Sequence, residues 1–218
     1  MLFRSSLEFH ANYAAKGRRD AEYRGGMVPN GAVNGTPELA YGVTPFWELG
    51  AYLPYAVTRD GEFHIGGAKL RTLFVTPNAQ DRNFFYGVNL ELGWAPTLFQ
   101  EERWNVEVRP IVGVRFKPVE FILNPIVDVP VSGTQRPLEF APAARLAYLF
   151  PDTWAGGLEH YSGVGRIDRV PRFSEQSHSL FAVVDYADEL FDLNFGIGRG
   201  YTGASDPWLF KLILGHDF

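Results

Sequence analysis

Cysteine is absent from this chain of 218 residues, which excludes disulfide frameworks, thiolate metal sites and cysteine nucleophiles. Charged residues are sparse at 21%, and the formal net charge of −5 argues against a basic surface of the kind that binds nucleic acid. Apolar runs are short, and none approaches the roughly 18 residues that a membrane-spanning helix needs. If this chain enters a membrane, it is not expected to do so with helices.

A secretory leader is also missing from the sequence. The first residues, Met1 to Ser6, lead straight into an alternating segment rather than into an apolar core with a small-residue cleavage site. Since the features below predict an exported protein, we expect the leader of the natural precursor to have been removed.

Aromatic residues, in contrast, are plentiful at 15%, and they fall in segments where apolar and polar side chains alternate. In Phe84–Trp94, Leu90 and Leu92 share one face while Asn89 and Glu91 share the other. A strand places successive side chains on opposite faces, so each such segment predicts a β-strand. Twelve segments show this pattern: Leu7–Tyr13, Glu38–Val43, Phe46–Val57, Gly67–Val75, Phe84–Trp94, Trp104–Phe116, Val119–Asp128, Leu138–Tyr148, Trp154–Tyr161, His178–Tyr186, Phe191–Gly198 and Pro207–Phe218.

The placement of the aromatic residues favours lipid over a soluble core. Rings cluster at segment ends, as Trp47 and Tyr55 do in one segment and Trp104 and Phe116 in another. Amphipathic rings at both interfaces are typical of transmembrane barrels. A soluble β-sandwich remains the alternative, although its outer face would carry more Lys, Thr and Ser. We therefore predict an all-β fold: a closed antiparallel transmembrane β-barrel of about 12 strands.

Connection lengths support this prediction because short and long connections alternate along the chain. Tight turns are expected at 44–45, 117–118, 151–152 and 188–189, and longer loops at 14–37, 57–66, 95–103, 129–137, 162–177 and 199–207; the intermediate connection 76–83 is the exception. Outer-membrane barrels have short periplasmic turns and longer external loops. The prediction is a single domain over residues 1–218, in the outer membrane, with both termini periplasmic.

The polar faces of the segments are expected to line the lumen of the barrel. Charges in a narrow lumen either pair with one another or stay hydrated, so this face is either an ion-pair network or a polar path that prefers cations. The candidate lumen-lining residues are Glu8, His10, Asn12, Glu48, Asn89, Glu91, Glu107, Arg109, Arg115, Glu120, Arg145, Asp185, Asp192 and Lys211.

Several stretches resemble the bacterial outer-membrane barrels grouped with the phenol-degradation-pathway transporter-like proteins. They are 38–55, 157–163, 179–186, 192–202 and 205–208. The resemblance implies an outer-membrane channel for small or hydrophobic molecules, and it supplies no catalytic residues. The C-terminal Phe218 resembles the signal by which barrels are handed to the assembly machinery of the outer membrane.

The sequence gives weaker support to catalytic, phosphate-binding or metal-binding functions. His10 faces inward with no obvious serine partner, so a lipid hydrolase is a minor alternative. The run Gly196–Gly200 lacks the strand–loop–helix context of a phosphate loop, and the five histidines show no metal-binding spacing. No cofactor or metal is expected. Bases in the loop 14–37, namely Lys16, Arg18, Arg19 and Arg24, could contact phosphates of lipopolysaccharide if they are not merely solvated.

The sequence thus predicts a channel or transporter for small solutes, surrounded by outer-membrane lipid and lipopolysaccharide. The alternative is a plugged barrel that anchors a partner in the cell envelope.

Overall fold

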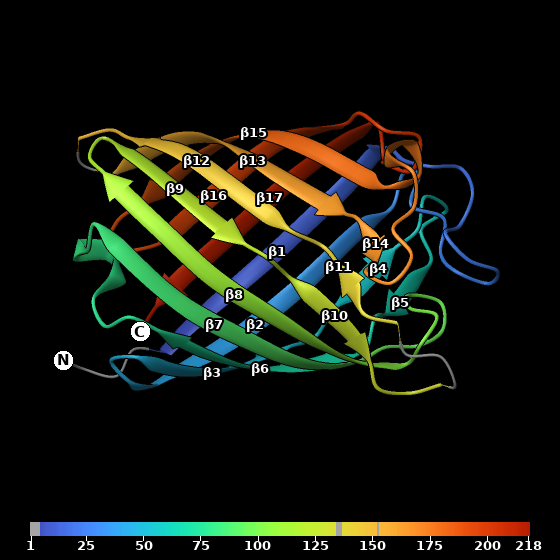
Figure 1. Cartoon of the computed structure of the whole chain (residues 1–218), viewed down its shortest axis with the longest axis horizontal. Helices are drawn as coiled ribbons and strands as arrows, with labels where there is room; N and C mark the ends of the chain where they lie inside the picture. The colour runs from blue at the N-terminus through green and yellow to red at the C-terminus, as the bar shows by residue number, and fades with distance from the viewer. Residues whose placement is uncertain (1–4, 134–136, 152) are drawn as a thin grey trace.

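The computed structural model describes residues 5–133, 137–151 and 153–218, and its strands form one closed antiparallel sheet (Figure 1). Two short 3-10 helices, η1 (Ala79–Asp81) and η2 (Phe173–Glu175), lie in connections. None of the helices in these ranges is long and apolar enough to cross a membrane. The β segments are β1 (Ser5–Lys16), β2 (Val33–Thr44), β3 (Trp47–Tyr52), β4 (Tyr55–Val57), β5 (Phe63–Ile65), β6 (Ala68–Val75), β7 (Phe84–Trp94), β8 (Trp104–Phe116), β9 (Val119–Asn124), β10 (Val127–Pro130), β11 (Glu139–Phe140), β12 (Ala143–Leu149), β13 (Trp154–Gly163), β14 (Gly165–Arg166), β15 (Ser177–Ala187), β16 (Asp192–Gly200) and β17 (Trp208–Asp217).

These segments combine into twelve strands, because five of the strands are interrupted. The pairs β3 and β4, β5 and β6, β9 and β10, β11 and β12, and β13 and β14 each continue one another along the wall. Three of the interruptions contain Pro54, Pro125 and Pro142, which have no N–H to donate to a neighbouring strand. Another contains Gly67 at φ +113°, where an added Cβ would lie 1.9 Å from the Trp94 carbonyl oxygen.

Pairing of the first and last strands closes the barrel. β1 pairs antiparallel with β2 on one side and with β17 on the other, with Phe9 opposite Leu214. The Phe218 N–H donates to the Ser5 carbonyl at 2.8 Å, so the pairing continues to the last residue. A closed sheet presents no free edge to hydrocarbon, where each unpaired backbone group costs several kcal/mol. The prediction of a closed barrel of about twelve strands is confirmed, and the β-sandwich alternative is wrong.

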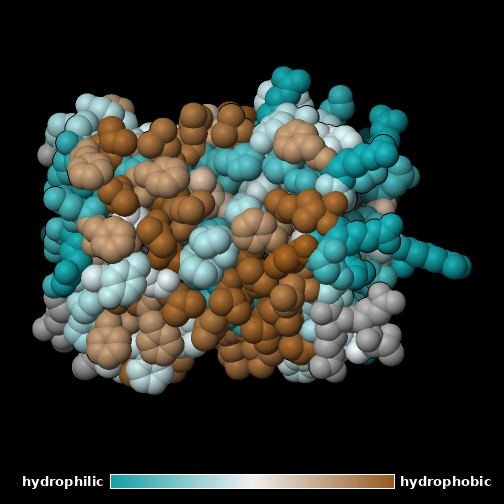
Figure 2. All heavy atoms as spheres, viewed as in Figure 1, coloured by the Kyte–Doolittle hydropathy of each residue, from teal (hydrophilic) through white to brown (hydrophobic). Residues whose placement is uncertain are grey.

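The outer wall carries a broad apolar band. Large exposed side chains such as Leu39, Leu70, Leu146 and Leu158 point outward from four of the strands, and the last two lie opposite each other on the neighbouring β12 and β13. Figure 2 shows apolar side chains across the barrel wall and hydrophilic ones gathered at the end with the long connections. At the opposite end, ring pairs such as Trp47 with Phe74 form part of an aromatic border, their centroids 5.9 Å apart. This distribution fits a hydrocarbon layer bounded by aromatic interfaces.

The start of β1 at Ser5 and the C-terminal Phe218 lie at one end of the barrel, together with the short connections (Figure 1). We call it the turn end, and the opposite one the loop end. The loop end differs from prediction in detail: β1 and β2 extend further than expected, which reduces the connection 14–37 to 17–32, and β4 and β5 shorten 57–66 to 58–62. Local alternation fades in these stretches while backbone pairing continues. The connection 95–103 is confirmed, and residue 152 of the tight turn 151–152 lies outside the described residues.

The intermediate connection 76–83 has a structural explanation at the turn end. Its helix η1 lies beside the lumen, where the Arg115 guanidinium donates to the carbonyl oxygens of Ala79 at 3.0 Å, Arg82 at 3.2 Å and Gln80. The same guanidinium pairs with Glu120. A connection long enough to reach into the barrel mouth is therefore fixed there by a lumen-facing cation.

The tight turn after β15 is organised by one carboxylate. Asp188 accepts hydrogen bonds from the backbone N–H groups of Leu190 at 2.7 Å and Phe191 at 3.0 Å, and from the Tyr186 hydroxyl at 2.7 Å. These bonds, chiefly the one from Phe191, favour the ionised form and lower the pKa of Asp188.

We therefore expect the Asp188→Asn variant to unfold more easily than wild type at neutral pH, by a margin that shrinks on acidification. The carboxylate stabilises the fold above its unfolded-state pKa, and that contribution is lost as pH falls through the lowered folded-state pKa. Unfolding midpoints of both proteins across pH 2–7 measure this margin (roughly the range in which carboxylates titrate). The adjacent Glu189→Gln is the control, and a margin independent of pH would contradict the role of Asp188.

Candidate pore

The inner wall of the barrel collects the polar faces of the strands. The structure places the fourteen sequence-predicted residues on this wall, where most contact one another; Asp192 lies at the turn end, and Asn12 is exposed inside the lumen. Sequence reasoning missed Lys69, Arg71 and Glu159. These residues alternate with Leu70 and Leu158, which could have identified them. The alternation is imperfect, however, because Leu73 shares the face of Lys69 and Arg71, and His160 shares the face of Leu158.

One group of charges lies on β1, β2, β3 and β6. The Arg71 Nε donates to Glu38 Oε1 at 2.6 Å, and the same guanidinium pairs with Glu48. On its other side Glu38 meets the imidazole of His10, whose Nε2 lies 3.1 Å from Glu38 Oε2 and 3.2 Å from Glu8 Oε2. Glu38 is only 3% exposed, so its charge depends on these partners.

A second group lies on the strands from β12 to β17, around Glu159 of β13. Its carboxylate pairs with Lys211 and accepts from Arg145 at 2.7 Å and from the Tyr161 hydroxyl at 2.7 Å. Arg145 also donates to Asp185 at 2.6 Å. Five strands, β12, β13, β15, β16 and β17, thereby share one network, which Asn194 completes by donating to Asp185 at 2.6 Å.

Further pairs lie on the neighbouring strands β6, β7 and β8. Lys69 Nζ lies 3.3 Å from Glu91, which also accepts from the Asn89 amide at 2.8 Å. Arg109 donates to Glu107 at 2.8 Å and lines a cavity in the lumen. These contacts follow the wall, so the charges neutralise one another without filling the space between the walls.

Open space remains along the barrel axis. A cavity of about 760 Å³ opens at the turn end beside Arg115 and Glu120, and one of about 680 Å³ opens at the loop end. Between them, a cavity of about 250 Å³ is lined by Arg109, Arg145 and Tyr161. Although it faces inward, Tyr161 is 41% exposed, which a lumen packed with side chains would not permit. The interior therefore holds water-sized space at three levels.

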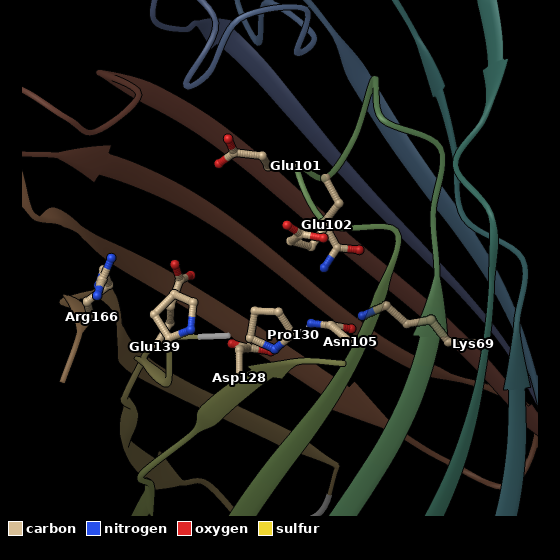
Figure 3. Close-up of a pocket in the computed structure, with 10 residues that line it drawn as sticks. Lys69, Glu101, Glu102, Asn105, Asp128, Pro130, Glu139 and Arg166 are labelled. Carbon is tan, nitrogen blue, oxygen red and sulfur yellow. Dashed lines mark hydrogen bonds between the residues drawn. The ribbon is translucent and has the colours of Figure 1, made fainter. Parts of the chain in front are cut away.

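The cavity at the loop end, which we call the vestibule, is predominantly acidic. Glu101, Glu102, Asp128 and Glu139 line it, against the cations Lys69 and Arg166. Figure 3 shows Glu101 and Glu102 on a connection above the strands that carry Asn105 and Asp128. Since Lys69 already pairs with Glu91, and Arg166 with Asp168, the vestibule keeps an excess of negative charge.

Two connections meet over this vestibule. The Tyr23 hydroxyl donates to the Thr97 carbonyl at 3.1 Å, and the Met27 N–H donates to the Leu98 carbonyl at 2.8 Å. The connection 17–32 thus crosses from β1 and β2 to reach the connection 95–103, and it narrows the loop end of the barrel.

The residues considered for a hydrolase or a phosphate-binding loop make ordinary structural contacts. The ring of His10 contacts carboxylates, and among the described residues no serine hydroxyl hydrogen-bonds to it. The run Gly196–Gly200 is part of β16, where a Cβ at Gly198 would lie 2.4 Å from the Phe181 ring. These glycines make room for a lumen side chain rather than for a phosphate.

The basic residues predicted in the loop 14–37 lie in different surroundings. The backbone N–H of Arg18 donates to Asp206 Oδ1 at 2.7 Å. Lys16, in contrast, is exposed beside Trp208 at the loop end of β1. Contact of these bases with lipopolysaccharide stays a prediction, as does recognition of Phe218 by the assembly machinery.

Comparison with known proteins supports the fold. The sequence matches no protein-family profile and no curated protein. Among solved structures, it is similar to an outer membrane channel from Pseudomonas putida F1, with 14% identity, a TM-score of 0.64 and coverage of 99% of this chain and 95% of that one. It is also similar to the NanC porin, with 8% identity, a TM-score of 0.61 and coverage of 96% and 97%. A bacterial polysaccharide outer membrane secretin follows, with 12% identity, a TM-score of 0.51 and coverage of 98% of each chain. At these identities the comparisons show that the chain has the fold of outer-membrane barrels.

Proposed function

We propose that this chain is a passive outer-membrane channel for small hydrophilic solutes, with a preference for cations. The observation that carries the proposal is the water-sized space at both ends and in the middle of a lumen walled by charged side chains. Solved structures with this fold that are described as a channel and a porin support it. Membership of the phenol-degradation-pathway transporter-like group is part of the same proposal and rests on the sequence resemblance.

The chemistry of the wall favours hydrophilic over hydrophobic cargo. A hydrophobic molecule would displace water from Arg109, Arg145 and Glu159 without replacing their hydrogen bonds, which is costly for charged groups. An ion or a small polar solute keeps its own hydration in such a lumen.

The acidic vestibule is expected to set the cation preference. We expect the double variant Glu101→Gln/Glu102→Gln to lower the cation-to-anion permeability ratio about twofold in roughly 0.1 M salt, where charges act over about 10 Å. Reversal potentials in planar bilayers under a salt gradient measure this ratio. The double variant Asp60→Asn/Glu62→Gln is the matched control, because it removes two carboxylates from the loop end outside the vestibule.

Several outcomes would count against the proposal. A folded barrel that conducts no ions would favour the plugged scaffold that anchors a partner, especially if one co-purifies in a fixed ratio. An equal change of selectivity in both double variants would mean that the overall charge of the loop end, and not the vestibule, determines the cation preference.

A further inference from the structure

A histidine and two glutamates converge on the lumen wall where β1 and β2 pair. Glu8 and Glu38 face each other directly across the two strands, and His10 lies one inward position further along β1. The imidazole Nε2 and one carboxylate oxygen from each glutamate all lie within 4.8 Å of one another. The three residues come from two rigid, paired strands, so their arrangement does not depend on a loop.

A single proton satisfies this group poorly. One N–H at Nε2 would have to be shared between two carboxylate oxygens, at 3.1 Å and 3.2 Å. Charge is also unbalanced, since the single guanidinium of Arg71 pairs with both Glu38 and Glu48, while Glu8 pairs with the imidazole of His10. Water cannot solvate the charge of Glu38, because its side chain is only 4% exposed.

A divalent metal ion would satisfy all three ligands at once. Zinc binds histidine nitrogen and carboxylate oxygen at about 2.0–2.2 Å, and tetrahedral geometry then separates neighbouring ligand atoms by about 3.3 Å. The two observed separations from Nε2 are close to that value. Nitrogen ligation favours zinc, copper or nickel over calcium, which takes six to eight oxygens. We propose that Glu8, His10 and Glu38 form a binding site for a divalent transition metal ion inside the lumen.

The surroundings complete the site. Arg71 Nε donates to Glu38 Oε1 at 2.6 Å and so fixes the carboxylate with its other oxygen, Oε2, directed at His10. Glu8 is 36% and His10 28% exposed, which leaves a fourth position open to water from the lumen. The site is therefore reachable by an ion that enters the barrel, and it does not depend on the proposed channel activity.

Calorimetric titration of the purified, folded full-length barrel with Zn²⁺ in detergent tests the proposal, with Co²⁺ absorption as a second probe. We expect one saturable Zn²⁺ site per chain, weakened about tenfold or more in the His10→Gln variant, by analogy with the loss caused by removing groups that support a metal ligand. Glu8→Gln removes the most exposed ligand and is expected to weaken binding with the least risk to folding.

The matched control is His64→Gln. His64 is also beside one glutamate, at 3.4 Å from Glu62, but it lies outside the three-residue group. This variant is expected to bind Zn²⁺ like wild type. Circular dichroism and heat-dependent mobility on gels establish that each variant is a closed barrel. Absence of saturable binding by wild type, or wild-type affinity in the folded His10→Gln and Glu8→Gln variants, would overturn the site, whether or not the barrel conducts ions.

Discussion

Replacing Leu158 with arginine is expected to lower the free energy of unfolding by about 2–4 kcal/mol, because an arginine near the bilayer midplane of a barrel loses its hydration. Leu158 lies in the middle of β13, is 48% exposed and packs beside Leu146 of β12 on the outer wall. Unfolding by denaturant after reconstitution in lipid vesicles, followed by tryptophan fluorescence, measures the change.

The control for this substitution is Leu138→Arg. Leu138 is 46% exposed, nearly the same as Leu158, but it lies in the connection before β11 at the loop end. Exposed loop positions usually tolerate such changes within about 0.5 kcal/mol. A water-soluble barrel would treat the two leucines alike, so equal effects would contradict a membrane-embedded wall.

Sequence alternation was sufficient to predict the strands because the lumen and the lipid impose opposite demands on the two faces. The segments Phe84–Trp94 and Trp104–Phe116 match β7 and β8 in both bounds. Alternation failed at strand ends near the loop end, where β2 already begins at Val33. There Asn34, Gly35 and Pro37 interrupt the alternation, and the backbone pairing with β1 defines the strand.

The sequence predicted which residues form the polar inner face, but it did not predict which of these side chains contact one another. Glu38 and Arg71 lie 33 positions apart, and their contact depends on the register of β2, β3 and β6. Register is defined by how two strands pair, so the sequence of one strand does not specify which residues of its neighbour lie opposite its own. The convergence of Glu8, His10 and Glu38 was invisible for the same reason, since only two of these residues are close in sequence.

Glu159→Gln is expected to destabilise the barrel by about 3 kcal/mol, because it leaves buried cations without their counter-ion. The side chains of Glu159 and Lys211 are 7% and 8% exposed, and Arg145 would keep only Asp185. The same unfolding measurement applies. The double variant Glu159→Gln/Lys211→Met is expected to recover part of the loss, since it removes the isolated charge along with its partner.

The exposed pair Arg166 and Asp168 provides the contrast, since it has comparable geometry, with nitrogen and oxygen 2.8 Å apart, but an Asp168 side chain that is 64% exposed. Asp168→Asn is expected to leave the unfolding midpoint nearly unchanged, because water compensates for the loss of an exposed ion pair. If Glu159→Gln costs no more than Asp168→Asn, the lumen network is fully hydrated and its charges act on passing solutes rather than on stability. A large difference would instead mean that the network stabilises the part of the wall formed by β12 to β17, and that its paired charges are fixed along the path that any solute must take.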